Sequence, residues 1–171
     1  MQFLVPRATT IDRAMLDDII EASGVPVTVG EGNVYDMMNI STAAIAASGT
    51  ATLETTLMGL PTLLVYRVNR LTYWLSKVLV HIESIGLPNI IMGRRVIPEL
   101  WQDDVTPDNI TDAVLPMLDD GPRRTELCEG LSARAPYDGE NRGLSCVQPK
   151  AVLTLQEKEV FISSTISWQG L

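Results

Sequence analysis

The sequence has few of the side chains that bind metals or form disulfides. Its 171 residues include two cysteines, Cys128 and Cys146, and one histidine, His81. The cysteines form no CxxC pair, whereas a structural zinc site uses four cysteine or histidine ligands at regular spacing. The composition therefore argues against a structural zinc site and against a disulfide framework, and it fits a reducing compartment.

Positive charge is also scarce, with 13 lysines and arginines against 21 aspartates and glutamates and a net charge of −8. A protein that follows a nucleic-acid backbone needs a dense basic surface, because it must displace counterions from the phosphates. We therefore expect no nucleic-acid partner. Ligands should be neutral, or should be anions held at a local site.

Long apolar runs are missing as well. No stretch approaches the roughly 18 apolar residues of a membrane span, and the start, MQFLVPRATTID, lacks the basic region and apolar run of a signal peptide. Hydrophobic residues make up 46% of the chain and charged residues 20%, as in ordinary globular proteins. We expect one folded domain, located in the cytoplasm unless it sits on a membrane surface.

Short apolar runs alternate with amphipathic helical segments, and this alternation predicts an α/β fold with a parallel, Rossmann-like sheet. The runs expected as strands are 3–5, 25–29, 43–47 and 62–66. The first expected helix is capped by Thr10 and stopped by Gly24, the second opens at Asn33, and the third follows Ser48-Gly49-Thr50 and runs to Met58. The other expected helices are 71–79, about 98–102, one from Thr106-Pro107, and about 123–134.

The pattern changes beyond Ala135, where two prolines and two glycines interrupt it. Residues 152–167 then alternate in hydropathy like a strand, instead of closing the domain with a helix. We therefore expect one domain over residues 1–134 and an aberrant or poorly ordered tail over residues 135–171.

The most informative stretch is ASGTATLE, residues 47–54, where a buried strand turns directly into a helix. Such a corner presents backbone N–H groups and the positive end of the helix dipole at the sheet edge where α/β folds bind phosphates. Gly49 lets an anion approach the backbone, and the hydroxyls of Ser48 and Thr50 can add hydrogen bonds. Glu54, one turn further on, can accept hydrogen bonds from a ribose. Alternatively, Ser48 or Thr50 only caps the helix and Glu54 only favours its first turn.

Several separate blocks of sequence occur in the order and spacing of one known family. They are SGTATLE at 48–54, Tyr66-Arg67, LTYWL at 71–75, LPN at 87–89 and GRRVIPELWQ at 93–102. From about Phe3 to Arg134 the chain resembles the donor-binding half of lipid A disaccharide synthase, a bacterial glycosyltransferase of the GT-B type. The resemblance implies a Rossmann-like parallel sheet with flanking helices.

The resemblance also implies a reaction. It is the transfer of 2,3-diacylglucosamine from its UDP carrier to 2,3-diacylglucosamine 1-phosphate, which gives the β-1,6-linked lipid A disaccharide and UDP. The implied partners are these two acylated sugars, the inner membrane by peripheral contact, and a second copy of the chain. Enzymes of this type generally need no bound metal or cofactor, and the sequence has no Asp-x-Asp motif.

The resemblance assigns contacts residue by residue. Gly49 and Thr50 would meet the diphosphate, and Glu54 would meet the ribose. The other matched positions are Tyr73 and Asn89, near the donor sugar or the cleft, and Arg94 and Gln102, which could hold phosphate or nucleotide groups. Simpler interpretations stay open: Tyr73 in the core, Arg94 on the surface beside Glu99, and Gln102 at the end of its helix.

The chain also departs from the family. Arg70, Gly86 and Arg95 stand where proline, serine and an acidic residue are usual. The family's amino-terminal half, which would carry the acceptor site and the general base, is missing. We therefore expect a donor-binding half that is inactive in isolation or, alternatively, a non-catalytic fragment acting at most as an interaction or dimerisation module. A dinucleotide-dependent oxidoreductase is disfavoured, because no GxGxxG follows an expected strand.

Overall fold

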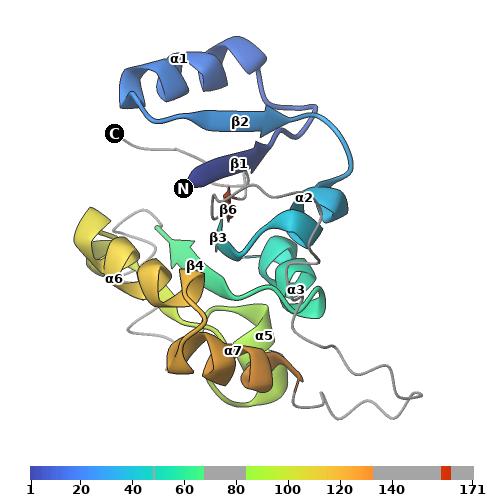
Figure 1. Ribbon diagram of the computed structural model, residues 1–171, viewed down its shortest axis with the longest axis vertical. Coiled ribbons are helices and arrows are strands. Elements are labelled where there is room, and N and C mark those ends of the chain that lie inside the picture. The colour runs from blue at the N-terminus through green and yellow to red at the C-terminus, as the bar shows by residue number, and fades with distance from the viewer. Residues whose placement is uncertain (48, 68–83, 133–158, 163–171) are drawn as a thin grey trace, which may run out of the picture.

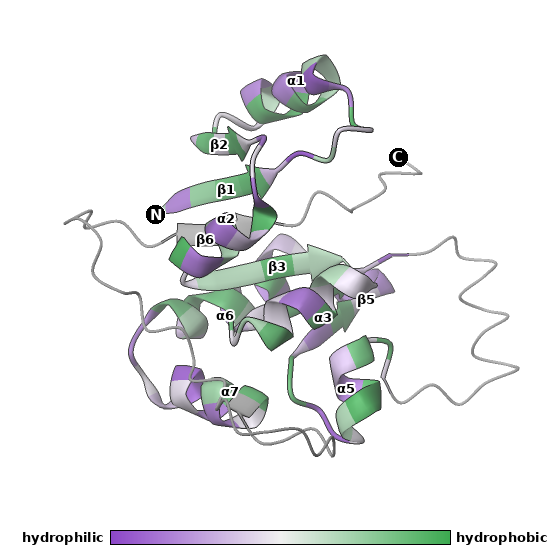
Figure 2. Cartoon of the chain, turned by 90° about the vertical axis from the view of Figure 1, so that its right-hand side faces the viewer, coloured by the Kyte–Doolittle hydropathy of each residue, from purple (hydrophilic) through white to green (hydrophobic). Residues whose placement is uncertain are grey.

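The computed structural model describes residues 1–47, 49–67, 84–132 and 159–162. Within these residues, six strands form a parallel sheet in the order β2-β1-β6-β3-β4-β5. Figure 1 labels the strands other than β5, which is labelled in Figure 2. The strands are β1 (Gln2–Pro6), β2 (Val27–Gly30), β3 (Ala43–Ala47), β4 (Thr62–Tyr66), β5 (Glu99–Trp101) and β6 (Glu159–Ile162). The expected α/β fold with a parallel sheet is therefore confirmed.

Helices connect the strands and cover the sheet. They are α1 (Arg13–Ser23), α2 (Val34–Ile40), α3 (Thr50–Leu57), α5 (Leu87–Met92), the short 3-10 helix η1 (Gln102–Asp104), α6 (Pro107–Leu118) and α7 (Pro122–Ser132). In the part of the chain that the structure describes, no helix combines the length and apolar character needed to cross a membrane.

Polar side chains set several helix ends, mostly as the sequence predicts. Asn33 and Thr106 cap α2 and α6 by accepting backbone N–H hydrogen bonds, and Gly24 ends α1 with φ 65°. The expected cap of α1 is wrong, because Asp12 and not Thr10 accepts the hydrogen bond at its start.

The core lies on both faces of the sheet, since alternate residues of a strand point to opposite faces. On one face Leu63 and Val65 pack against α6 and α7. On the other face Ala44 packs with Met38 of α2 and with Leu60. Figure 2 shows β3 as hydrophobic along its whole length, as expected for a strand covered on both sides.

The segment at 98–102 is largely a strand, so the expected helix there is wrong. Residues 99–101 form β5, which pairs with β4 and aligns Glu99 with Leu64. The residues of this segment form a strand because the backbone of β4 offers them hydrogen-bond partners. The spacing of apolar residues within the segment could not predict this pairing. As a consequence, Gln102 lies at the carboxyl end of a strand.

Of the expected tail, the structure describes the residues of β6. This strand pairs with β1 on one side and β3 on the other, within the stretch 152–167 whose alternation predicted a strand. The domain boundary at 134 stays a prediction. The expected helix at 71–79 lies outside the described residues.

Cys128 of α7 is disulfide-bonded, and the described residues contain no free cysteine. The sequence argued against a disulfide framework, and it gave no sign of this bond. Spacing along the sequence identifies metal-binding pairs, but it does not say which thiols the fold brings within bonding distance.

Arg124 anchors α7 to the neighbouring elements. Its side chain is buried, and Nη1 donates hydrogen bonds to the carbonyl oxygens of Thr42 (2.7 Å) and Met117 (2.8 Å). Burial lowers the pKa of this guanidinium, while the exposed Asp120, 3.8 Å away, acts in the opposite direction. The group stays charged and joins α7 both to the entry of β3 and to the end of α6.

Replacing Arg124 with methionine should lower the free energy of unfolding by about 2–3 kcal/mol, because both carbonyl oxygens lose their donor. Urea denaturation measures the difference. The matched control is Arg123→Met, since Arg123 is the neighbouring residue, is exposed and pairs with the exposed Glu126. Equal losses in the two variants would contradict the anchoring role of Arg124.

Candidate functional site

The carboxyl ends of three neighbouring strands meet at one edge of the sheet. β4 pairs with β3 on one side and with β5 on the other, and all three run in the same direction. The residues that follow them therefore gather at this edge: 49–50 after β3, 67 after β4 and 102 after β5. In α/β folds, ligands bind in the crevice outside this edge.

Gly49 forms the turn from β3 into α3. Its backbone has φ 121° and ψ −157°, a conformation that glycine adopts freely and other residues only with strain. The hydroxyl of Thr52 donates to the carbonyl oxygen of Gly49 (2.8 Å) and so holds the turn. Beyond its chain neighbours, a Cβ on Gly49 would have no atom within 4 Å, so the space in front of the turn is open.

α3 begins without a side-chain cap from the described residues. Gly49 has no side chain to cap it, and no described side chain accepts a hydrogen bond from the amides of Thr50 or Ala51. By contrast, Asp12 and Asn33 cap α1 and α2. The first N–H groups of α3 and the positive end of its dipole are therefore available to an anion.

Glu54 lies one turn beyond Thr50, and side chains four residues apart share a helix face. Its side chain is half-buried. Its backbone carbonyl accepts a hydrogen bond from the amide of Met58 (3.0 Å), but its carboxylate has no partner among the described residues. The carboxylate can therefore accept hydrogen bonds from a ligand.

Two further residues lie at this edge. Arg67 follows β4, is exposed and forms no ion pair with a described residue, so its charge is available to an anion. Gln102 follows β5, is buried and has φ 54°, a left-handed conformation that is uncommon outside glycine and often found at functional sites. Sequence reasoning named Gln102 as a contact but not Arg67, although the block Tyr66-Arg67 was a signal for it.

Asn89 lies in α5 and is engaged within the protein. Its Nδ2 donates to the carbonyl oxygen of Ile97 (2.9 Å) and to Oε1 of Glu99 (2.6 Å). Its Oδ1 accepts from the amides of Val96 (2.6 Å) and Ile97 (2.9 Å). A side-chain amide has two donor hydrogens and two acceptor lone pairs, so no hydrogen-bonding position of Asn89 is left for a ligand.

Glu99 is buried beneath the start of α5 and is not paired with Arg94. Besides Asn89, it accepts hydrogen bonds from the amides of Ile85 (3.1 Å) and Gly86 (3.0 Å) and from the hydroxyl of Ser84. A Cβ on Gly86 would lie 2.8 Å from Oε1 of Glu99, so this carboxylate and the backbone are in close contact. Sequence reasoning missed the role of Glu99, because only the pairing of β5 with β4 brings it there.

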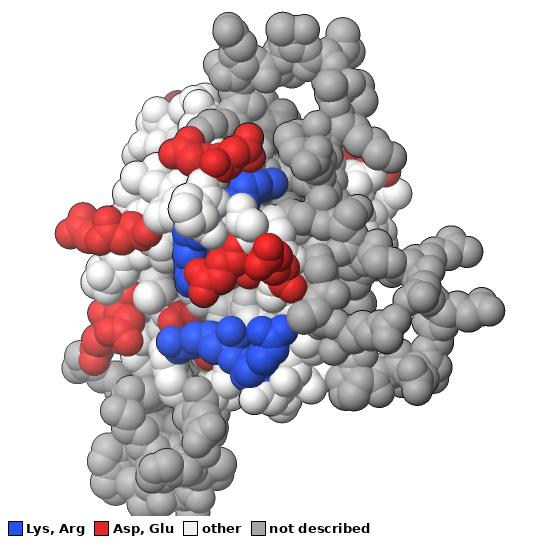
Figure 3. All heavy atoms as spheres, turned by 60° about the horizontal axis from the view of Figure 1, so that its bottom comes forward, with Lys and Arg blue, Asp and Glu red and all other residues white. Residues whose placement is uncertain are grey.

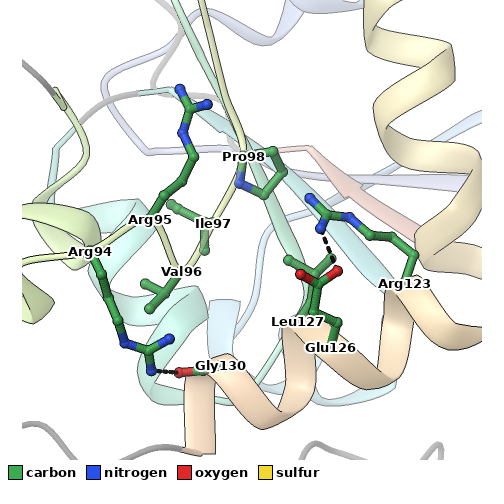
Figure 4. Close-up of a pocket in the computed structure, with 9 residues that line it drawn as sticks. All are labelled: Arg94, Arg95, Val96, Ile97, Pro98, Arg123, Glu126, Leu127 and Gly130. Carbon is green, nitrogen blue, oxygen red and sulfur yellow. Dashed lines mark hydrogen bonds and ion pairs between the residues drawn. The ribbon is translucent and has the colours of Figure 1, made fainter.

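Arg94 lies where the strands begin, at the end of the sheet opposite the corner at Gly49. It belongs to the loop that leads into β5, whereas the corner at Gly49 follows β3. Its Nη2 donates to the carbonyl oxygen of Gly130 in α7 (3.2 Å; Figure 4). The structure therefore does not bring Arg94 together with Gly49, while Ser48 and Tyr73 lie outside the described residues.

One family model and several curated relatives show what this chain is similar to. A family model described as lipid-A-disaccharide synthetase matches residues 1–139. The chain is 42% identical over 132 residues to the lipid-A-disaccharide synthase of Geobacter sulfurreducens, and the match covers 77% of this chain and 34% of that protein. It is 38% identical over 155 residues to the lipid-A-disaccharide synthase of Myxococcus xanthus, with 91% of this chain and 40% of that protein covered.

The chain thus spans between a third and two fifths of the length of these relatives. The family model, in turn, covers most of this chain, including β3, α3, β4 and β5, whereas β6 lies outside the match. On this match, the chain belongs to the lipid-A-disaccharide synthetase family.

Proposed function

We propose that the chain is the donor-binding part of a glycosyltransferase of lipid A biosynthesis. The proposed reaction transfers 2,3-diacylglucosamine from UDP to 2,3-diacylglucosamine 1-phosphate and gives lipid A disaccharide and UDP. The observation that carries the proposal is the start of α3 at the carboxyl edge of the sheet, where no described side chain caps the helix and the turn at Gly49 is open. Membership of the family supports the same donor.

The proposed site acts on the leaving group. When the acceptor hydroxyl attacks the anomeric carbon of the donor, the bond from that carbon to the diphosphate breaks and negative charge grows on UDP. The amides of Thr50 and Ala51, the dipole of α3 and the guanidinium of Arg67 would face this charge. The amides are held in place by the helix, so they need little reorganisation to stabilise the leaving diphosphate.

The other residues have distinct proposed roles. Glu54 would accept hydrogen bonds from the ribose, one turn away from the diphosphate. Gln102 lies at the same sheet edge and would approach the nucleotide. Asn89 acts indirectly, because it joins α5 to the entry of β5. Ser48 and Tyr73 stay predicted contacts.

The proposed substrates carry acyl chains that partition into a bilayer. We therefore place the proposed reaction in the cytoplasm, at the surface of the inner membrane. The net charge of −8 provides no general attraction to anionic lipid, so the membrane contact would be local.

A second candidate function is an interaction or dimerisation module, which the surface of α1 favours. None of the residues of this helix is buried, and Met15 and Ile19 are 53% and 44% exposed. An open apolar helix face suits contact with another protein surface, including a second copy of the chain. Light scattering tests this function with the parent chain and the double variant Met15→Glu with Ile19→Glu. A parent dimer that becomes a monomer in the variant would support it, and a parent chain that is already a monomer would contradict it.

Calorimetric titration with UDP and UMP tests the donor site. UDP should bind at least about tenfold more tightly than UMP, because the second phosphate adds hydrogen bonds from the α3 amides. Circular dichroism establishes that the chain is folded. A folded chain that gives neither heat nor a thermal shift with millimolar UDP would contradict the donor site.

Replacing Glu54 with glutamine should weaken UDP binding about tenfold, because the ribose hydroxyls lose a charged acceptor. Glutamine keeps the size of the side chain, so the melting temperature should stay unchanged. The control is Glu21→Gln, an exposed glutamate of α1. If Glu54→Gln and Glu21→Gln both bind UDP like the parent chain, Glu54 is not part of the site.

A further inference from the structure

A pocket lies near the amino-terminal ends of the strands, away from the proposed donor site. Its walls are the loop 94–98 and residues 123–130 of α7, as Figure 4 shows. The loop precedes β5, whereas the corner at Gly49 follows β3, and the two strands are parallel within the same sheet. The pocket and the donor corner therefore lie at opposite ends of the strands.

Three arginines line this pocket, two from the loop and one from the helix. Arg94 is oriented by its hydrogen bond to the carbonyl oxygen of Gly130 (3.2 Å), and Arg123 pairs with Glu126 (2.6 Å). Arg95 is exposed and has no ion pair or hydrogen bond with a described residue. Since Glu126 is the acidic residue in the lining, the pocket keeps an excess of positive charge.

This positive charge contrasts with the chain as a whole, whose net charge is −8. The basic residues that the structure describes are Arg7, Arg13, Arg67, Arg94, Arg95, Arg123 and Arg124. Three of these seven, Arg94, Arg95 and Arg123, line the pocket. Figure 3 shows a continuous basic patch next to acidic side chains, on the face turned toward the viewer. The basic area is therefore local, which disfavours an extended polyanion as the ligand.

Apolar side chains lie beneath the pocket and expose little surface. Val96, Ile97 and Leu127 are buried there, and Pro98 is half-buried. A guanidinium presents pairs of N–H donors that match the oxygens of a phosphate. Guanidinium groups above side chains that expose little apolar surface suit a single anionic group.

We propose that this pocket binds a phosphate monoester, with Arg95 and Arg123 as its principal contacts. A tetrahedral dianion can accept hydrogen bonds from the loop and from α7 at the same time, whereas a planar carboxylate has fewer oxygens and one charge. The phosphate can belong to a soluble metabolite or to a lipid headgroup. This site lies outside the donor site of the proposed function and does not depend on it.

Two-dimensional NMR of the full chain tests the site, with glycerol 3-phosphate as the soluble probe. The amides of Arg95, Val96 and Gly130 should shift on titration, and those of Gly49 and Thr50 should not. The double variant Arg95→Ala with Arg123→Ala should bind at least about tenfold more weakly. The matched control is Arg13→Ala, which removes an exposed arginine of α1.

Sedimentation with vesicles separates the two sources of phosphate. Binding to phosphatidylcholine vesicles that contain phosphatidic acid, without binding to glycerol 3-phosphate, assigns a lipid headgroup; binding to the soluble ester assigns a metabolite. Either result supports the site only if the double variant loses the binding. Absence of binding to both probes, or equal binding by the double variant, would overturn it. The double variant should bind UDP with the same affinity as the parent chain. Failure of the phosphate site and failure of the donor site can therefore be told apart.

Discussion

The change of Thr50 to aspartate is expected to reduce the affinity for UDP at least about 100-fold while leaving the domain folded. Thr50 is the first residue of α3 and is exposed. A carboxylate there stabilises the helix start through the dipole, but it repels the diphosphate. At a separation of ~5 Å and an effective dielectric constant of ~20, each pair of like charges costs about 3 kcal/mol, or two orders of magnitude in affinity.

The neutral variant Thr50→Asn is the matched control for this experiment. It has nearly the same shape as aspartate and should lose less than about tenfold in affinity, because it adds no charge. Thermal denaturation should show that Thr50→Asp melts at or above the parent temperature, since the new carboxylate favours the helix. If Thr50→Asp folds and binds UDP as tightly as the parent chain, the start of α3 is not the phosphate site.

The change of Asn89 to leucine should lower the free energy of unfolding by about 4 kcal/mol, because each buried polar group left without its partner costs about 1–3 kcal/mol. Leucine has a similar volume. However, it leaves the amides of Val96 and Ile97 and one oxygen of Glu99 without the side chain that satisfies them. Urea denaturation followed by circular dichroism measures the loss.

Asn109 provides the control for Asn89. It is exposed, and its Nδ2 donates to the carbonyl oxygen of Asp104 (2.9 Å). Asn109→Leu should change the free energy of unfolding by less than about 1 kcal/mol, because water replaces the lost hydrogen bond. A similar small loss in both variants would mean that Asn89 does not hold α5 to the entry of β5.

The elements that form the proposed donor site were predictable from local sequence. Residues 43–47 and 62–66 are short apolar runs between turn signals, and they form β3 and β4 with these bounds. Ser48-Gly49-Thr50 interrupts the apolar pattern and marks the turn into α3. The glycine was informative because the turn requires a positive φ that other residues avoid.

The parts that escaped prediction depend on contacts between distant segments. β5 exists because the edge of β4 accepts it, and its apolar spacing alone fits a helix equally well. The resemblance implied a place near the donor sugar or the cleft for Asn89, yet its side-chain amide is held by backbone groups in the loop before β5. Arginine is a residue type that commonly binds phosphate, which is why Arg94 was predicted as a contact. However, Arg94 precedes β5, so it lies at the end of the sheet opposite the corner at Gly49.

The backbone amides of Gly49, Thr50 and Ala51 offer the most direct test of the account. Their two-dimensional NMR signals, followed while UDP is added to the folded chain, report whether the diphosphate meets the start of α3. We predict that these three signals shift most and reach saturation together, while those of Arg94 and Gly130 stay in place. Saturable UDP binding that shifts other amides and leaves these three unchanged would contradict the account.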